Sequence, residues 1–462
     1  MSVVFQTSGN AVNNLKKKVT GKLTKLKEKD LIGITEIGEY AFCQSTTLQE
    51  VILPASINII KSYAFQNCSA LTKITIPGTV TEIGDNVFDG CNNLNEIEFI
   101  GTMEMWGNIT KGTNWDGGLN YYLTTYDASP ELSYFLENDG TNDYYRVTAV
   151  NCSNPTVIIP DTYQGIPVKI LGEGSVAFST AVTTVILPQS LTKIASSAFS
   201  GCKKLTSLVI PAGVQTIGTN VLAGCTALQT ITIPFIGNVA GKAPGDSYQY
   251  PLGYLFGTNY SSGTKGITQY YYNGSSLISS YYYFPTPLKS VKVLGGNLLY
   301  GAFYSCNFLT NIILGNIQSI EEYAFYNCKK LSNIVIPAST TSIQSGRVFE
   351  GCDNLKYFIV DSNNTSYHVT NNCIIDTQNK ILVAGLSDSA IPTDASEVTS
   401  IGNYAFYKKI KTINLVIPDN IISIGNYAFY QCTIKVLTLP DNLITIGEYS
   451  FYYCYSRKKH QS

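Results

Sequence analysis

The sequence predicts an α/β repeat solenoid, a right-handed coil that is mostly strand and turn and has a parallel, concave β-sheet. Two observations predict this fold. A block with the pattern L-x-x-I-x-I-P, as in Leu71–Pro77, recurs along the chain, and a Phe-x-x-Cys turn follows most copies of it. Within each run of repeats, successive turns lie 22 to 24 residues apart. A fixed period of this length indicates units that stack side by side.

Each part of the unit has a physical role. The three apolar side chains of the first block point inward on a strand, and the intervening side chains point outward. Proline ends the strand because it cannot donate a further ladder bond. A second apolar pair, such as Val80 and Ile83, follows, and Gly84 allows the next turn. One unit cannot bury these faces alone, whereas stacked units bury all of them.

These motifs resemble the BspA-like leucine-rich-repeat family, whose unit reads approximately LTSITIPxSVTSIGxxAFxxC. The resemblance covers residues 33 to 455 and extends to the irregular stretches. It implies a leucine-rich-repeat coil. The family occurs in bacteria and mucosal protozoa, and it is associated with surface display, adhesion and protein binding. The resemblance therefore implies a cell-surface or secreted protein.

The composition excludes some partners. The net charge is −1 and only 14% of the residues are charged, so nothing global attracts nucleic acid. The 33 tyrosines are the unusual feature. A neutral surface rich in tyrosine is typical of recognition. The alternative is that these tyrosines line the turns of the coil, as in the repeated EYAF and NYAF sequences.

Nine of the twelve cysteines occupy the same place in successive units, and we expect them to form a buried ladder of free thiols that act as small hydrophobic groups. Neighbouring coils bring them close, but parallel Cβ directions disfavour disulfides. The chain has no C-x-x-C pair, which argues against structural zinc, and we predict no metal or cofactor. Cys43, Cys152 and Cys373 lie outside this pattern and receive no role. The nine are Cys68, Cys91, Cys202, Cys225, Cys306, Cys328, Cys352, Cys432 and Cys454.

Residues 1–32 differ from the rest. Seven lysines accompany Leu15, Val19, Leu23 and Leu26, which is the spacing of an amphipathic helix with a basic face. Such a helix either covers the open end of the solenoid or contacts an anionic membrane through residues 15–29, and we favour the cap. We identify no signal peptide or transmembrane segment, so a cytoplasmic location stays an alternative.

Residues 33–455 are predicted to form a single solenoid that is interrupted three times, and residues 456–462 a tail. The interruption at 101–156 contains a stretch with two tryptophans and a hairpin with Asn-Asp and Asp-Gly turn residues. The interruption at 235–287 is rich in tyrosine and glycine, and we expect it to be ordered. The third, 361–395, is expected to replace one unit with a hairpin-like variant. The unit before Phe199 is assigned to Phe178.

Catalytic chemistry has few candidate residues. His368 and His460 are the only histidines, so a general base is nearly absent. Glu96 and Glu98 face one way on a strand and could imitate a glycosidase pair, but a solvated strand face is the favoured interpretation. We expect no enzyme activity. The alternatives are a catalytic or carbohydrate-active module in an interruption, an intracellular scaffold, or a structural spacer.

The outward side chains of the L-x-x-I-x-I strands form the predicted binding surface. They make a hydroxyl-rich ladder with acidic groups near its start and lysine near its middle, and we expect it to contact a protein or glycan. The alternative is that threonine and serine are there for β-propensity and solubility. The candidate residues are Thr72, Lys73, Thr75, Glu96, Glu98, Thr206, Thr230, Thr232, Lys292, Asn311 and Asn333.

Overall fold

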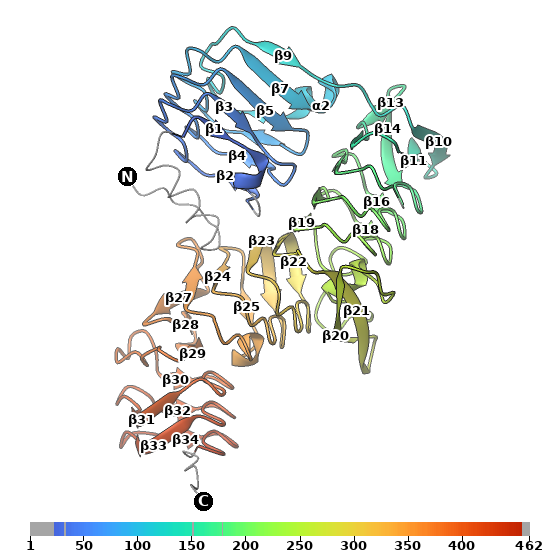
Figure 1. Cartoon of the computed structure of the whole chain (residues 1–462). Coiled ribbons are helices and arrows are strands. Elements are labelled where there is room, and N and C mark those ends of the chain that lie inside the picture. The colour runs from blue at the N-terminus through green and yellow to red at the C-terminus, as the bar shows by residue number, and fades with distance from the viewer. Residues whose placement is uncertain (1–22, 32–33, 150–151, 178, 455–462) are drawn as a thin grey trace, which may run out of the picture.

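A computed structural model describes residues 23–31, 34–149, 152–177 and 179–454. It confirms the predicted repeat solenoid, which consists mostly of strands and turns (Figure 1). Each regular coil contributes one strand to a front sheet and a shorter strand to a back sheet. The chain curves so that the N-terminal coils lie above β19, β22 and β23 of the central coils.

The front sheet is built from the L-x-x-I-x-I blocks. Its strands pair in parallel, and Lys73 of one coil lies beside Glu96 of the next. The front strands are β1 (Lys25–Leu26), β3 (Glu50–Ile52), β5 (Lys73–Pro77), β7 (Glu96–Ile100), β9 (Tyr122–Thr124), β12 (Thr156–Ile158), β15 (Thr184–Ile186), β17 (Ser207–Val209), β19 (Thr230–Ile233), β22 (Ser290–Leu298), β23 (Asn311–Ile320), β24 (Asn333–Ile336), β26 (Tyr357–Val360), β31 (Lys411–Val416) and β33 (Thr433–Thr438).

The back sheet is built from the second apolar pair of each unit, and β22 and β23 are long enough to run from the front face into it. Regular back strands pair in parallel, as Ile60 does with Ile83. They are β2 (Glu36–Ile37), β4 (Ile59–Ile60), β6 (Glu82–Ile83), β8 (Thr110–Lys111), β14 (Ile166–Leu171), β16 (Lys193–Ile194), β18 (Thr216–Ile217), β25 (Ser342–Ile343), β30 (Ser400–Ile401), β32 (Ser423–Ile424) and β34 (Thr445–Ile446).

The described residues of each interruption include an antiparallel hairpin. The first has the short helix α2 (Met103–Asn108) and the predicted hairpin of β10 (Leu132–Asn138) and β11 (Asp143–Ala149). Strand β13 (Thr162–Tyr163) then pairs antiparallel with β14. The second has the 3₁₀ helix η2 (Leu252–Leu255) and the hairpin β20 (Thr264–Tyr272) and β21 (Leu277–Pro285). The third has β27 (Tyr367–Thr370), β28 (Cys373–Asp376) and β29 (Ile381–Gly385).

The predicted amphipathic helix is wrong for its described part. Residues 23–31 form strand β1 and the 3₁₀ helix η1 (Glu28–Asp30), because Leu26 is fully buried and pairs with Val51 of the first regular coil. Sheet pairing here overrides the helical spacing of the leucines. The rest of that helix, residues 15–22, and the tail at 456–462 lie outside the described residues, so the cap and the domain boundaries stay predictions.

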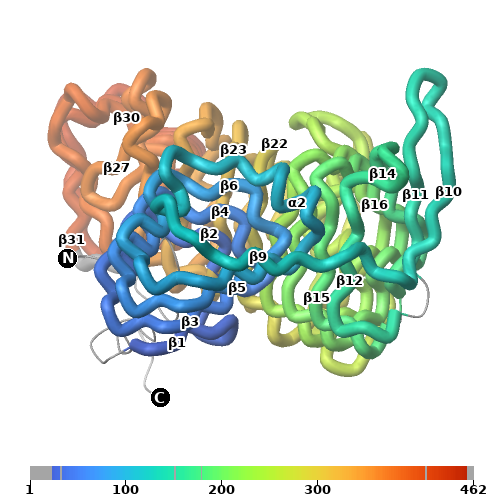
Figure 2. The backbone as a smooth tube through the Cα atoms, turned by 90° about the horizontal axis from the view of Figure 1, so that it is seen from above, coloured from blue at the N-terminus to red at the C-terminus, as the bar shows by residue number. Residues whose placement is uncertain are grey.

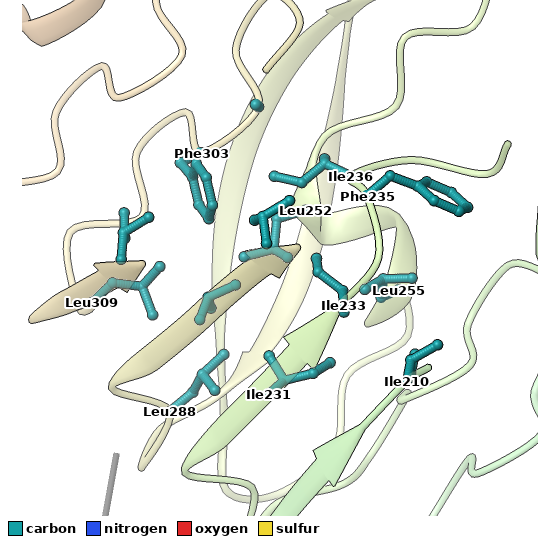
Figure 3. Close-up of a cluster of buried hydrophobic side chains, with 14 of the residues drawn as sticks. Ile210, Ile231, Ile233, Phe235, Ile236, Leu252, Leu255, Leu288, Phe303 and Leu309 are labelled. Atoms are coloured by element: carbon teal, nitrogen blue, oxygen red, sulfur yellow. The ribbon is translucent and has the colours of Figure 1, made fainter. Parts of the chain in front are cut away.

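Rings and aliphatic chains fill the interior. Phe42, Phe65 and Phe88 stack with centroids 5.3 and 5.8 Å apart, and the same column forms in the later coils. The second interruption joins this core, since Leu252 and Leu255 of η2 lie beside Ile233 (Figure 3). A further 3₁₀ helix, η3 (Gly346–Phe349), places Phe349 in this column.

One turn was assigned to the wrong residue. Val176, not Phe178, takes the phenylalanine place before Phe199, because its backbone N–H donates to Ala198 and its carbonyl accepts from the thiol of Cys202. Phe178 lies outside the described residues. Val176 lies 23 residues before Phe199, which is the regular period, whereas Phe178 lies 21 residues before it, so the assignment followed the residue type and not the spacing.

The predicted ladder of buried free thiols is confirmed for eight of its nine cysteines, whereas Cys454 is partly exposed, and the thiols have a role beyond filling space. All twelve cysteines are free, and ten are buried. Cys68, Cys91 and Cys225 each donate to the carbonyl of the phenylalanine in the preceding coil at 3.1 Å. The same bond recurs in the later coils. The thiol is the second donor to this carbonyl, which also accepts from a backbone N–H of its own turn, as Phe65 does from Cys68 at 3.1 Å.

We predict that a thiol reagent will label Cys43 and Cys454 first in the native protein, because both are partly exposed. Burial raises the pKa of Cys202 and Cys432 to about 12, so these two are not thiolates at pH 8. After denaturation all should react. Mass spectrometry of labelled peptides reads this out, and rapid native labelling of Cys202 or Cys225 would contradict the buried ladder.

The same thiols make the fold sensitive to alkali. The pKa of Cys202 rises from 9.0 to about 12 on folding. Above pH 9 the thiol ionises in the unfolded chain but not in the folded protein. The free energy of unfolding is therefore unaffected by Cys202 below pH 9 and falls as pH rises towards 12. Each such cysteine should lower the free energy of unfolding by about 1.4 kcal/mol per pH unit in this window. Thermal unfolding from pH 8 to 11 tests this. The fall should be shallower in Cys202→Ala, and an identical slope would refute it.

Candidate partner-binding surface

The N-terminal coils carry an open ladder of alternating charge on the front sheet. Lys25 bonds Glu50 at 2.6 Å, and one coil pair further on Lys73 bonds Glu96 at 2.6 Å. Thr72 is exposed, and the side chains of Lys73 and Glu96 are 32% and 38% exposed. Adjacent coils place opposite charges side by side, which is the favourable cross-strand arrangement.

Glu98 is the most constrained member of this ladder. Its carboxylate accepts from Tyr126 at 2.6 Å and from Thr75 at 2.9 Å, and Lys73 lies 3.1 Å away. Burial pushes the pKa of Glu98 up, but these three donors outweigh it and the pKa lies below its usual value. With both Glu96 and Glu98 bound to Lys73, the pair has the geometry of an ion-pair cluster rather than of a glycosidase acid and base.

The central part of the predicted surface is buried, unlike the open ladder of the N-terminal coils. Thr206 is exposed and Asn333 is half-buried, but the four candidates between them are buried. Thr230 is 5% exposed, Thr232 1%, Lys292 7% and Asn311 7%. Neighbouring side chains of the same sheet account for part of this burial, since Thr232 lies between Val209 and Lys292 and Asn311 bonds Ser290 at 3.0 Å, and another part of the chain contacts Lys292.

The covering part includes the N-terminal coils. The amide oxygen of Asn58 accepts from the ammonium group of Lys292 at 3.3 Å, across 234 residues of sequence. A cavity of about 190 Å³ between the two parts is lined by Glu28, Pro54 and Ser56 on one side and by Thr206 and Thr230 on the other. Figure 2, seen from above, shows the N-terminal coils overlapping the strands β22 and β23.

The tyrosines form a second surface feature, along the turns. Tyr404, Tyr427 and Tyr449 stack with centroids 5.0 and 5.1 Å apart, and Tyr407 and Tyr430 make a parallel column at 5.0 Å. The structure therefore places these residues in the turns, partly exposed. The repeated EYAF and NYAF sequences indicated tyrosines in the turns, but they revealed neither the stacked columns nor Arg347, which continues one of them between Tyr323 and Tyr404 at 4.8 and 4.3 Å.

Catalytic and metal chemistry find little support in the described ranges. His368 bonds only the hydroxyl of Thr377, at 2.9 Å. No group of three histidine, cysteine, aspartate or glutamate side chains among the residues placed by the structure is arranged to hold a metal ion. Across the described part of the chain, no helix combines the length and the apolar character needed to cross a bilayer.

The stacked coils, the thiol ladder and the parallel front sheet define a leucine-rich-repeat solenoid, a class in which the fold serves as a binding scaffold. Six copies of the BspA type leucine rich repeat region match residues 19–110, 150–241, 296–377 and 386–461. The chain therefore belongs to the BspA-type leucine-rich-repeat family. The two longest unmatched stretches between these segments contain the hairpins β10–β11 and β20–β21.

Solved structures of similar proteins include several bacterial repeat proteins. A leucine-rich repeat protein from Bacteroides ovatus is 19% identical, with a TM-score of 0.28, over 92% of this chain and 81% of that one. One from Eubacterium ventriosum is 20% identical, with a TM-score of 0.27, over 72% and 88%. A leucine rich cell surface protein from Faecalibacterium prausnitzii is 20% identical, with a TM-score of 0.18, over 74% and 89%. No curated protein matches the chain.

We predict that Lys73→Gln will destabilise the N-terminal coils by about 0.5–1 kcal/mol at pH 7, because it leaves Glu96 and Glu98 as neighbouring like charges. The stabilisation from Glu98 is present above its unfolded pKa and is lost as pH falls through the lower folded value. The difference should therefore vanish well below pH 4. Thermal unfolding at both pH values measures it. Lys25→Gln, which breaks one exposed pair, is the control, and an equal loss there would contradict this account.

Proposed function

We propose that this protein is a non-enzymatic binding solenoid that recognises a protein or glycan through its front sheet, in the setting of adhesion at a cell surface. The observation that carries the proposal is the open front face of the N-terminal coils. There, Thr72 and Asn95 are exposed beside the half-buried charges of Lys73 and Glu96. A rigid sheet holds these groups in fixed register, so little conformational entropy is lost when a ligand binds.

The chemistry of this face favours a hydrogen-bonding ligand over a strongly charged one. Lysine and glutamate alternate and neutralise one another, so the face has no large field of one sign. Tyr122 and Tyr126 adjoin the ladder with 81% and 41% of their surface exposed. Tyrosine beside satisfied polar groups is typical of recognition surfaces. Membership of a repeat family that is associated with cell surfaces supports the proposed location. The fold alone would support neither the location nor the adhesion.

The test uses two defined arrays, one of glycans and one of purified extracellular proteins. We expect the double variant Thr72→Arg with Asn95→Arg to reduce binding to any hit by at least about tenfold, because two arginines disturb the ladder at exposed positions. The matched control is Thr341→Arg with Ser342→Arg, which places the same charge on exposed positions at the back sheet.

The control should bind as the parent does. If both double variants bind equally well, the front sheet is not the contact surface. If neither array gives a hit above background, the proposal of a direct protein or glycan ligand fails. Circular dichroism of all variants establishes that the fold is intact.

A further inference from the structure

The contact between the N-terminal coils and the central front sheet is loosely made. The ammonium group of Lys292 can donate three hydrogen bonds. Within the described residues it donates one, to the amide oxygen of Asn58 at 3.3 Å. Burial lowers the pKa of Lys292, and Lys61 adds to the effect whereas Glu36 opposes it. A buried ammonium without a paired carboxylate carries a desolvation cost that one amide oxygen does not offset.

The packing at this contact is also incomplete. The cavity of about 190 Å³ lies between the two parts, and its lining is mostly hydroxyl and amide groups, such as Ser56, Thr206 and Gln229. Interiors and permanent interfaces are close-packed and more apolar. The coil interiors of this protein meet that standard, since Phe65, Phe88 and Phe303 are fully buried in stacked columns. The contact between the two parts resembles a transient interface instead.

A narrow pivot joins the two parts. The N-terminal core touches the next coils through Ile158 and Ile186. A Cβ at Gly78 would lie 2.8 Å from Cγ2 of Ile186, so the Ile186 side chain packs directly against the backbone there. Hydrogen bonds from Asn108 to Asp161 and from Thr162 to Glu104 lie at the same junction. The rest of the connection is the first interruption, so separation of the two parts at Lys292 leaves every coil intact.

We infer that the central front sheet is an interaction surface whose occupant in the free chain is the chain's own N-terminal coils, and that an external ligand of this sheet competes with them. The competition rests on the proposed function, whereas the self-occupancy does not. Thr230 lines the cavity at this contact and Thr232 lies beside Lys292, so both become more accessible when the N-terminal coils move away. The cost of burying Lys292 keeps the closed state from being much more stable than the open one.

The experiment measures how accessible the covered face is, without any ligand. Thr232 pairs in register with Lys292 and is 1% exposed, so Thr232→Cys reports on opening. Its labelling by a thiol reagent is compared in the parent, in Asn58→Lys and in Asn58→Asp. Asn58→Lys places two ammonium groups together, whereas Asn58→Asp gives Lys292 a carboxylate. Thr75→Cys is the matched control, because Thr75 holds the equivalent place in its own coil and is buried under Glu98 and Tyr126 instead.

We expect Asn58→Lys to speed labelling of Thr232→Cys by at least about tenfold and Asn58→Asp to slow it, with no change at Thr75→Cys. Small-angle scattering should show a larger radius of gyration for Asn58→Lys. Lys292→Met offers a second variant, and it should slow labelling because it removes the buried charge. Equal rates in all variants, or rapid labelling of Thr232→Cys in the parent, would overturn the inference. If labelling behaves as expected but the arrays give no ligand, self-occupancy stands and the proposed function fails.

Discussion

Among the nine ladder cysteines, all except Cys306 donate a hydrogen bond to a carbonyl of the preceding turn, and the register of the regular coils depends on this bond. It requires the Phe-x-x-Cys turns to lie directly on one another, as they do for Cys68 over Phe42. The stacked turn in turn forces left-handed backbone at fixed places, such as φ = 56° at Tyr40 and 58° at Asn67. Tyrosine tolerates this conformation poorly, at a cost of about 1–2 kcal/mol. Ring stacking between coils offsets part of that cost, since Tyr40 and Tyr63 stack at 4.8 Å.

Stacking at this spacing also governs the outer surface. Any outward side chain lies beside its counterpart in the next coil, so a like charge repeated there would destabilise the sheet. The N-terminal coils meet this condition by alternating Lys25, Glu50, Lys73 and Glu96. The later turns meet it with neutral tyrosine columns, and Arg347 enters one column beside Glu322 at 3.9 Å. The low charge content of the chain is thus a consequence of the repeat as much as a sign of its partners.

The regular coils could be predicted from the sequence because their determinants are local. The block Leu71–Pro77 carries its own strand and its own end, and the cysteine place repeats with the coil. The hairpin at Leu132–Ala149 was equally predictable from its turn residues. Local signals failed where pairing partners decide the structure. Leu26 has helical spacing with its neighbours, yet it pairs with Val51 of β3 and joins the sheet. The place assigned to Phe178 belongs to Val176, which the 23-residue step to Phe199 already favoured.

On the candidate surface, too, local sequence decides some features and contacts between distant residues decide others. Thr75 and Thr232 hold equivalent places in their coils, and nothing in their local sequence distinguishes them. Thr75 bonds Glu98, which in turn bonds Tyr126, so residues close in sequence cover it. Thr232 lies beside Lys292, which bonds Asn58, 234 residues away in the sequence. That arrangement depends on the angle at which the first interruption joins two rigid stacks, and no periodic signal encodes it. The interruptions therefore decide which stretches of a repetitive face are open to a ligand, while the repeats decide what chemistry that face offers.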